Sequence, residues 1–417
     1  MFIHVTHDTS IDRAQTSDGG RSVVVIGGGI VGLCVALSLQ ERGFEVTIAD
    51  RREAMPSPSW GNAGRLAVEA GEPLSSIATL RSLPGSLFSR GGPVSFPPSA
   101  IARWLPFGLR LLAASTTKKF DHGRTALSAL VAQAVPAWRR RLSASGAPEL
   151  LVEAGHYAVW EDADSVARGH AASQRNTGAV TPLELDAVEM ARLRGLLRAP
   201  IADALKFTGS ASIADPGELL SHLQHAFVSA GGHLEQRRLS VAQASQMAHR
   251  VVVAAGVESG ELLAPLGHAV PMIAERGYHL QQPDPSWPQN MPPICFEDRT
   301  IVVTRFRAAL RMTSFVEFTT RDAPPDARKW ARLRQHAKEL GLPFDDRATQ
   351  WLGSRPTLPD YLPAIGRSRK HPNVFYAFGH QHLGLTLAAI TGDLLAAVMS
   401  DTRPAIDVAP FDIDRFG

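Results

Sequence analysis

Cysteine is scarce in this chain, whose 417 residues include only Cys34 and Cys295. Two cysteines are too few for a disulfide framework or a thiolate-held metal cluster, so we expect no metal site. The scarcity fits a reducing cytoplasm. Cys34 falls on a predicted helix, where we expect it to serve packing.

Neither sign of charge prevails, and no long apolar run occurs. Lys and Arg number 43 against 40 Asp and Glu, and a net charge of +3 does not call for a nucleic-acid partner. No stretch reaches the roughly 18 uninterrupted apolar residues of a membrane span. The first twenty residues are polar and lack the apolar core of a signal peptide, so we interpret them as a flexible lead. The length allows two domains.

The most informative segment runs from Arg21 to Asp50. A β-branched run predicts a strand buried on both faces, followed by a tight turn and a helix. The turn has the G-x-G-x-x-G spacing that lets backbone approach a pyrophosphate, with Gly27, Gly29 and Gly32 at the fixed positions. Asp50 ends the next strand, where a carboxylate can accept both hydroxyls of a ribose. This argues against NADP and leaves NAD and FAD open.

Two stretches after this unit are irregular in composition. The small residues of 59–64 would let backbone amides approach a flat ligand, or they form a plain surface loop. The segment 84–117 mixes proline-broken stretches with Leu, Phe and Trp around Arg103 and Arg110. It is either a wall of a substrate domain, packed on the core, or an exposed apolar patch that touches a lipid surface.

Further along, local patterns predict a series of elements. Asp215, Pro216 and Glu218 have the spacing of a helix N-cap, first turn and capping box. Other patterns predict a helix over 125–145, a strand pair over 151–160, a helix over 182–197, a parallel strand over 250–255, antiparallel strands between 278 and 318, a helix over 326–340, and a loop after Trp351.

With these pieces in place, the chain resembles the FAD-dependent D-amino-acid dehydrogenase and oxidase superfamily, which includes glycine and sarcosine oxidases. The resemblance covers nearly everything from Arg21 to about Ser400. It rests on four blocks: VVVIGGGIVGLCVALSLQERGFEVTIAD, the S-x-G-N-A-G of 59–64, VVVAAGVES with ERGYHL, and WLGSRPTLPDYLPAIG with YAFGHQHLGLT. The last block favours FAD over NAD.

The resemblance implies an α/β fold in which a Rossmann-like FAD-binding domain is interleaved with an antiparallel-sheet substrate domain. After the lead at 1–20, the FAD-binding domain would comprise 21–82, 206–268 and 351–417. The substrate domain would comprise 83–205 and 269–350.

The resemblance also implies which residues hold FAD. Its pyrophosphate and adenosine would lie against the first block and the flavin against the second and fourth. The expected cofactor residues are Gly27, Gly29, Ile30, Val31, Gly32, Asp50, Arg51, Arg52, Asn62, Ala63, Gly64, Arg65, Leu66, Ala255, Gly256, Gly379, His380, Leu383, Gly384, Leu385 and Thr386. Relatives carry a longer β-meander before Val251, with a strand valine at the adenine; here Val241 is the expected substitute.

Three residues are the catalytic candidates. Arg355 matches the position that holds the substrate carboxylate, a task suited to the parallel donors of a guanidinium; the alternative is a salt bridge. Tyr278 matches a position near the active-site entrance, unless it serves packing. His382, with His279 beside it as a weaker candidate, is either catalytic or structural. One of Arg305, Arg307 and Arg311 is a candidate second carboxylate ligand, or all three line a solvated strand face.

The implied reaction is oxidation of a D-amino or D-imino acid by hydride transfer from Cα to flavin N5. D-proline and cis-4-hydroxy-D-proline are the expected cyclic substrates. The alternatives are a glycine- or sarcosine-type oxidase and a flavin-bearing subunit of an electron-transfer complex. The electron acceptor would be oxygen or a quinone. We expect a cytoplasmic protein. Two further hypotheses concern its partners: peripheral contact with the inner face of the membrane, and assembly with a second copy of the chain.

Overall fold

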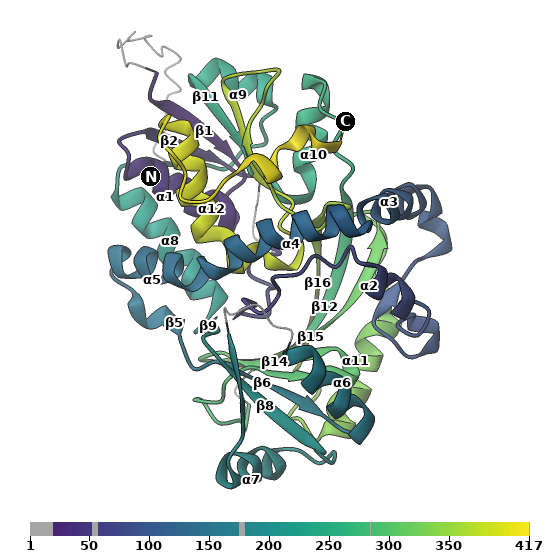
Figure 1. Ribbon diagram of the computed structural model, residues 1–417. Helices are drawn as coiled ribbons and strands as arrows, with labels where there is room; N and C mark the ends of the chain where they lie inside the picture. Colours follow the sequence, from purple (N-terminus) through teal and green to yellow (C-terminus); the bar gives the residue numbers. More distant parts are fainter. Residues whose placement is uncertain (1–19, 52–56, 175–179, 284, 417) are drawn as a thin grey trace, which may run out of the picture.

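A computed structural model describes residues 20–51, 57–174, 180–283 and 285–416. Two sheets divide the molecule, as Figure 1 shows: a parallel sheet with its helices in the upper part, and a larger sheet in the middle and lower part. The α/β fold class predicted from the sequence is confirmed. Strands of the upper sheet come from three separate parts of the chain.

In the described part of the chain, six strands form the upper sheet in the order β10-β2-β1-β11-β18-β17. All neighbours are parallel except β17 and β18. The inner strands β1, β11 and β18 are short and largely apolar, as expected of strands covered on both faces. Their bounds are His233–Glu235, Glu45–Ala49, Ser22–Ile26, Arg250–Val253, Val374–Phe378 and Ala364–Arg367.

The larger sheet runs β16-β12-β15-β14-β13-β6-β8-β7, with β4 paired to β15. The bounds in that order are Thr349–Thr357, Ile273–Pro283, Ala309–Thr319, Ile301–Arg305, Ile294–Phe296, His156–Trp160, Asp203–Thr208, Thr181–Glu184 and, for β4, Val94–Ser95. A small third sheet joins β3 (Arg65–Leu66), β9 (Ala211–Ile213) and β5 (Leu151–Val152). Figure 1 shows β5 and β9 of this small sheet at mid-height, between the two larger sheets.

Helices cover both sheets. Their bounds are α1 Ile30–Gln40, α2 Ile77–Ser82, α3 Ile101–Ala114, α4 Thr117–Ala132, α5 Ala134–Ser145, α6 Ala163–Ser173, α7 Ala187–Leu196, α8 Pro216–Ser229, α9 Val241–Met247, α10 Ser259–Leu263, α11 Ala327–Leu340 and α12 Gly384–Met399. Short 3₁₀ turns occupy Phe88–Arg90, Pro98–Ala100, Pro148–Leu150, Gly256–Glu258, Ala264–Leu266, Glu297–Arg299, Gln381–Leu383, Ala409–Phe411 and Ile413–Phe416.

Helix α12 packs along α1 in the core of the upper part. A Cβ at Gly392 would overlap with the backbone of Cys34, so only glycine allows the two helices this approach. Cys34 itself is fully buried, and burial raises the pKa of its thiol to about 12. The stretch Gln381–Met399 is long and apolar enough to cross a membrane by length and composition, but 78% of it is buried inside the protein.

Several local predictions differ from the structure. The helix predicted over 125–145 is two helices, α4 and α5, which meet at Gln133. The segment 151–160 gives two strands that join different sheets, β5 with β9 and β6 with β8 and β13. The segment 182–197 begins as strand β7 before it becomes α7. For β5, β6 and β7, pairing with strands that are distant in the sequence decides the structure, and local periodicity does not show that pairing.

The stretch after Trp351 stays in strand β16 as far as Thr357, and the predicted loop follows only at 358–363. Gly353 and Pro356 suggested irregular backbone, but β16 lies at the edge of the sheet, where proline is tolerated. The predicted N-cap of α8 is confirmed, because Asp215 accepts from the N–H groups of Gly217 and Glu218 at 2.7 and 3.1 Å. Glu218 does not complete a capping box; its carboxylate pairs with Arg307 at 2.6 Å.

Candidate active site

The turn after β1 is shaped by glycines at two close contacts. A Cβ at Gly27 would overlap with the Ala254 carbonyl at the end of β11, and Gly27 has a φ of 111°. A Cβ at Gly32 would overlap with the carbonyl of Gly27. Glycine at both positions therefore brings strand β1, helix α1 and strand β11 together at the carboxyl edge of the parallel sheet, where open α/β sheets bind their ligands.

Above this turn the backbone is open. A Cβ at Gly29 would meet only Ser59 Oγ, at 3.4 Å, and one at Gly256 would meet nothing within 4 Å. Gly29 is the N-cap residue of α1 and offers no side chain; the N–H of Ile30 donates to Ser59 Oγ at 3.0 Å, and the N–H groups that follow it in the first turn have no side-chain cap. The edge therefore has the backbone cradle that a dinucleotide phosphate needs.

Asp50 lies at the end of β2, beside the same turn. Its Oδ2 accepts from the N–H of Gly28 at 2.6 Å, which fixes the carboxylate at the predicted ribose position. Arg51 forms an ion pair with Glu258 near the start of α10. Arg52, the other residue expected at the adenine, lies outside the described residues.

The small-residue loop 57–64 is anchored from the larger sheet. Arg311 of β15 donates to the carbonyls of Trp60 and Asn62 at 2.6 and 2.5 Å, and to Gln281. It is 2% exposed, and burial lowers its pKa to about 9. Sequence patterns suggested a carboxylate ligand or a solvated residue, but its donors hold this loop instead. Beside it, Gly64 adopts a φ of 74° and donates to Asn62 Oδ1 at 2.8 Å.

The segment 379–386 approaches the same loop from the far end of the chain. Ala67 donates its N–H to Thr386 Oγ1 at 3.0 Å, and this contact ties α12 to the stretch after β3. His380 contacts Thr391 Oγ1 at 2.9 Å, and burial lowers its pKa to about 3. The second and fourth sequence blocks meet at Trp60 and Trp351, whose ring centroids lie 6.4 Å apart. Leu66, Leu383 and Leu385 are buried in the adjoining core.

Arg355 pairs with a buried carboxylate that the sequence did not single out. Its guanidinium donates to Glu275 Oε1 at 3.0 Å and to the Phe315 carbonyl at 3.1 Å. Glu275 is 2% exposed, and its other oxygen accepts from Thr357 and Tyr361 at 3.0 and 3.4 Å. Arg355 is 25% exposed. Its side chain is therefore held in one place while part of the guanidinium stays accessible.

Gly277 makes room for this arginine. A Cβ there would overlap with Arg355 Nη2, so the guanidinium lies directly over the glycine in the middle of β12. The cross-strand register Glu275–Arg355 puts both side chains on one face of the sheet. The sequence signal was present in the quoted ERGYHL block, but only strand pairing shows which arginine its glutamate meets.

Arg65 and Glu69 form a second charged group. Arg65 forms an ion pair with Glu69 and contacts His156 Nε2 at 3.3 Å, and His156 Nδ1 contacts Ser210 Oγ at 2.8 Å. Burial lowers the pKa of His156 to about 3 and raises that of Cys295, on the neighbouring strand β13, to about 12. Among the described residues, Glu69 Oε2 is a buried atom with no hydrogen-bond partner.

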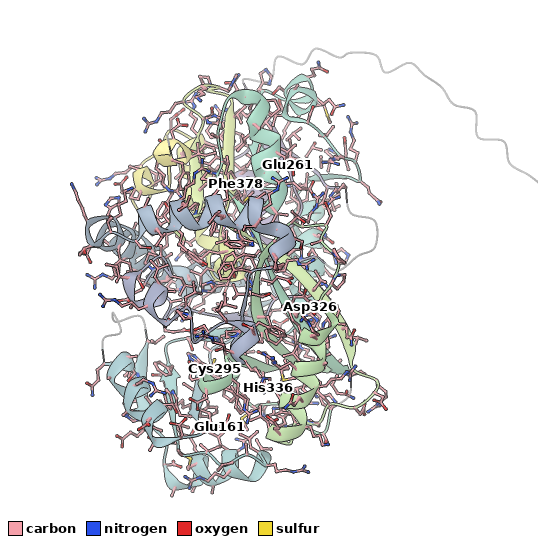
Figure 2. The ribbon with its side chains drawn as sticks, turned by 90° about the vertical axis from the view of Figure 1, so that its right-hand side faces the viewer. Glu161, Glu261, Cys295, Asp326, His336 and Phe378 are labelled. Carbon is pink, nitrogen blue, oxygen red and sulfur yellow. The ribbon has the colours of Figure 1, made fainter. Side chains whose placement is uncertain are left out.

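His382 lies within electrostatic reach of both groups. Burial lowers the pKa of its imidazole to about 4, while the Glu275 charge acts in the opposite direction and Arg355 and Arg65 act with burial. The ring is therefore neutral at neutral pH. His382 and Arg355, two of the three catalytic candidates, share one region between the two sheets. In Figure 2, Phe378 at the end of β18 lies in the upper part of the molecule and Cys295 of β13 in the lower part.

Tyr278 lies on the opposite face of β12. Its hydroxyl donates to Glu317 Oε2 at 2.8 Å, and its ring packs edge-on against Trp330 of α11. It is 1% exposed, and burial raises its pKa. The structure does not bring Tyr278 together with Arg355 and His382. The weaker candidate His279 does face their side, stacked on Trp351 at 4.7 Å between ring centroids.

Val241 does not lie on a strand. It is the first residue of α9, 4% exposed, and packs with Ile26 and Val251 in the core beneath the parallel sheet. Ser240 caps this helix, and Gln243 completes a capping box. The short connection before β11 therefore folds as a helix where the resemblance predicted a shortened meander.

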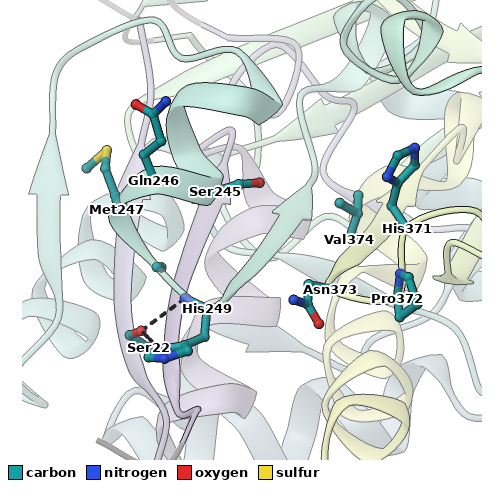
Figure 3. Close-up of a pocket in the computed structure, with 10 residues that line it drawn as sticks. Ser22, Ser245, Gln246, Met247, His249, His371, Pro372, Asn373 and Val374 are labelled. Atoms are coloured by element: carbon teal, nitrogen blue, oxygen red, sulfur yellow. Dashed lines mark hydrogen bonds between the residues drawn. The ribbon is translucent and has the colours of Figure 1, made fainter. Parts of the chain in front are cut away.

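One surface pocket lies at the wrong end of the parallel sheet for a cofactor. Figure 3 shows it between Ser22 and His249, which join at 2.8 Å, and Asn373 and Val374 across from them. These residues begin β1, β11 and β18, so the pocket is at the amino edge. Ligands of open α/β sheets bind at the carboxyl edge.

The residues at the carboxyl edge fit FAD. The open backbone at Gly29 and Gly256 fits a pyrophosphate, and the fixed carboxylate of Asp50 fits a ribose. Fold and site together define a dinucleotide-binding α/β protein. The chain belongs to the DAO family of FAD-dependent oxidoreductases, whose characteristic pattern matches residues 22–398. The prediction of FAD is confirmed.

Curated relatives match over nearly their whole length. A D-amino-acid oxidase of Bradyrhizobium diazoefficiens is 30% identical over 95% of this chain and 99% of its own. A D-amino acid dehydrogenase 2 of Ralstonia nicotianae is 29% identical over 94% and 100%. Among solved structures, glycine oxidase from Geobacillus kaustophilus has a TM-score of 0.70 at 21% identity, covering 94% of this chain and 98% of that one.

Proposed function

We propose that this enzyme oxidises the Cα–N bond of a D-amino or D-imino acid, with D-proline or cis-4-hydroxy-D-proline as the favoured substrates. The carrying observation is the Arg355–Glu275 pair, a fixed and partly accessible guanidinium on the sheet face that meets the cofactor edge. Such a group suits a substrate carboxylate. The curated relatives named for D-amino acids support the same substrate class.

In this proposal the chain positions the substrate and the cofactor supplies the chemistry. Bound FAD provides the acceptor for the α-hydrogen. Arg355 holds the carboxylate through parallel N–H donors, and Glu275 keeps the guanidinium from turning away. His382 stays neutral at neutral pH, so it adds no charge beside Arg355 and can exchange hydrogen bonds with the substrate nitrogen.

Glu69 gives this site a second means of recognition. Glu69 Oε1 pairs with Arg65, while Glu69 Oε2 has no hydrogen-bond partner among the described residues. The charge of Glu69 acts on His382, so the carboxylate lies near that ring. A carboxylate in that position can accept from a substrate ammonium, imino N–H or hydroxyl. This would suit a cyclic imino acid, which carries a ring N–H and, in 4-hydroxyproline, a ring hydroxyl.

A glycine- or sarcosine-type oxidase is the second candidate, favoured by the fold shared with glycine oxidase. The two candidates differ in the size and hand of the substrate. For the acceptor, the proposal allows oxygen or a quinone, and a quinone requires the chain to reach a membrane surface.

Anaerobic flavin bleaching tests the proposal. The holoenzyme is mixed with D-proline, cis-4-hydroxy-D-proline, D-alanine, glycine or sarcosine, and the loss of flavin absorbance is followed. We expect the two cyclic D-imino acids to bleach the flavin fastest. Faster bleaching by glycine or sarcosine would favour the second candidate, and no bleaching by any of the five would contradict both.

A further inference from the structure

Helix α3 carries an apolar stripe on its solvent side. One face is buried, with Phe107 packed near Phe318 of β15. The opposite face exposes large apolar side chains at intervals of four, four and three residues, which line up along a helix. They are Ile101, Leu105, Leu109 and Leu112, which are 46 to 61% exposed. Ile77 of α2, 46% exposed, adds to this surface.

The segment that carries the stripe has basic residues and no acidic ones. Between Glu72 and Asp121 the chain has no acidic residue, and its basic residues there are Arg81, Arg90, Arg103, Arg110, Lys118 and Lys119. Among the described residues none of these six is in an ion pair, and Arg90 donates only to the Pro84 carbonyl, at 3.3 Å. Arg103 and Arg110 are seven residues apart, so they lie along one flank of α3.

An apolar groove extends the same surface. It has a volume of about 1450 Å³ and lies between α2, α3 and the start of α11, with Leu83, Leu87, Trp104 and Leu112 among its walls. Figure 1 shows α2 and α3 together at the right-hand edge of the molecule, away from the parallel sheet. No described helix or strand of this chain covers the stripe, since its four residues remain exposed.

We propose that this α2–α3 face docks on an anionic lipid surface. A helix with a large apolar face, bordered by Arg or Lys, is the form that lies in the plane of a membrane interface. Each basic residue near an anionic surface adds to the attraction. The segment 73–120 carries six basic residues and no acidic one, and this positive charge favours anionic headgroups over a second copy of this chain, whose matching face would carry the same charge.

The docked face would lie beside the substrate site. Phe318, which packs near Phe107 of α3, is the cross-strand partner of Glu275, the residue that holds Arg355. Docking therefore puts this side of the enzyme within a membrane interface, where a quinone acceptor resides. The lipid contact itself does not depend on which substrate the enzyme oxidises.

Vesicle sedimentation tests the proposal. The holoenzyme is mixed with phosphatidylcholine vesicles with or without phosphatidylglycerol, and the bound fraction is measured at low and high salt. The variant L109E/R110E places two acids on the stripe and its flank. The control V188E/R192E makes the same charge change on α7, where Val188 is 77% exposed. Flavin content and dye-linked turnover show that both variants are folded.

We expect the unaltered enzyme to bind only the vesicles that contain phosphatidylglycerol, and salt to weaken this binding. Binding should fall at least about tenfold in L109E/R110E and stay unchanged in V188E/R192E. Equal binding by the two variants, or no binding of the unaltered enzyme to anionic vesicles, would overturn the proposal. So would an oligomer in vesicle-free solution that L109E/R110E dissociates, because a second copy would then cover the face. Sedimentation needs no turnover, so its result stands apart from the proposed reaction.

Discussion

The two halves of the candidate site differ in the chemical groups that form them. At the parallel sheet the surface is backbone, shaped by Gly27 and Gly32 and left open at Gly29. Opposite it the surface is paired charge, Arg355 with Glu275 on the larger sheet and Arg65 with Glu69 at the small third sheet. The first half depends on the absence of a Cβ within one short turn. The second depends on the register of strands and loops far apart in sequence, so the two should fail differently when altered.

The largest effect is expected from Gly32→Ala. The added methyl would overlap with the Gly27 carbonyl, and β1 and α1 would have to separate where the pyrophosphate binds. We expect purified protein with little or no FAD and a lower Tm, measured by absorbance and thermal unfolding. Gly195→Ala is the control, because a Cβ there meets nothing within 4 Å and α7 should gain slightly. Full FAD occupancy in Gly32→Ala would contradict the backbone half of the account.

Arg355→Lys should weaken substrate binding and leave FAD binding unchanged. An ammonium cannot present parallel donors to a carboxylate, so KM should rise by about ten- to a hundredfold while FAD stays bound, a loss of roughly 1.4 to 2.7 kcal/mol. Steady-state kinetics and the flavin spectrum measure the two properties. Kinetics equal to those of the unaltered enzyme would remove Arg355 from the substrate site.

The buried imidazole of His156 should make the larger sheet sensitive to acid. Its pKa is about 3 in the folded chain, and a histidine titrates near 6.5 when unfolded. Between these values the unfolded chain binds more protons, so stability falls as pH drops from about 6.5 towards 3, by up to about 1.4 kcal/mol per pH unit. His156→Gln should flatten the fall of Tm with pH in this window. An unchanged slope of Tm against pH would show that other groups govern the loss of stability at low pH.

Tyr278→Phe should give the smallest effect. The lost hydroxyl contacts Glu317, so we expect about 1 kcal/mol of lost stability by denaturant unfolding. Because Tyr278 lies on the face away from Arg355, KM and FAD content should not change. A KM shift comparable with that of Arg355→Lys would place Tyr278 at the substrate after all.

The backbone half was largely predictable. The glycine spacing, the following helix and Asp50 are close in sequence, so local pattern alone indicates a dinucleotide site, and the family match confirms FAD. The connection before β11 was not predictable in detail. Val241 starts a helix because its segment buries apolar side chains beneath the sheet, a tertiary effect that local pattern does not show.

The charged half was predictable only in part. Arg355 was named from its resemblance to a carboxylate-binding position, but its partner Glu275 was not, since the register of β12 with β16 sets that pair. In the sequence, Arg311 is one of three alternating arginines on a predicted strand. Its burial and its contacts with the 57–64 loop arise only when distant segments fold together.

A ligand titration tests the division between the two halves most directly. Cyclopentanecarboxylate has the carboxylate and ring size of the proposed substrate but no amine to oxidise, so it can bind without turnover. The account predicts a saturable change in the flavin spectrum of the holoenzyme. It also predicts that Arg355→Met keeps its full complement of FAD and loses that change. An Arg355→Met variant that lacks FAD, or that binds the carboxylate as the unaltered enzyme does, would contradict the account.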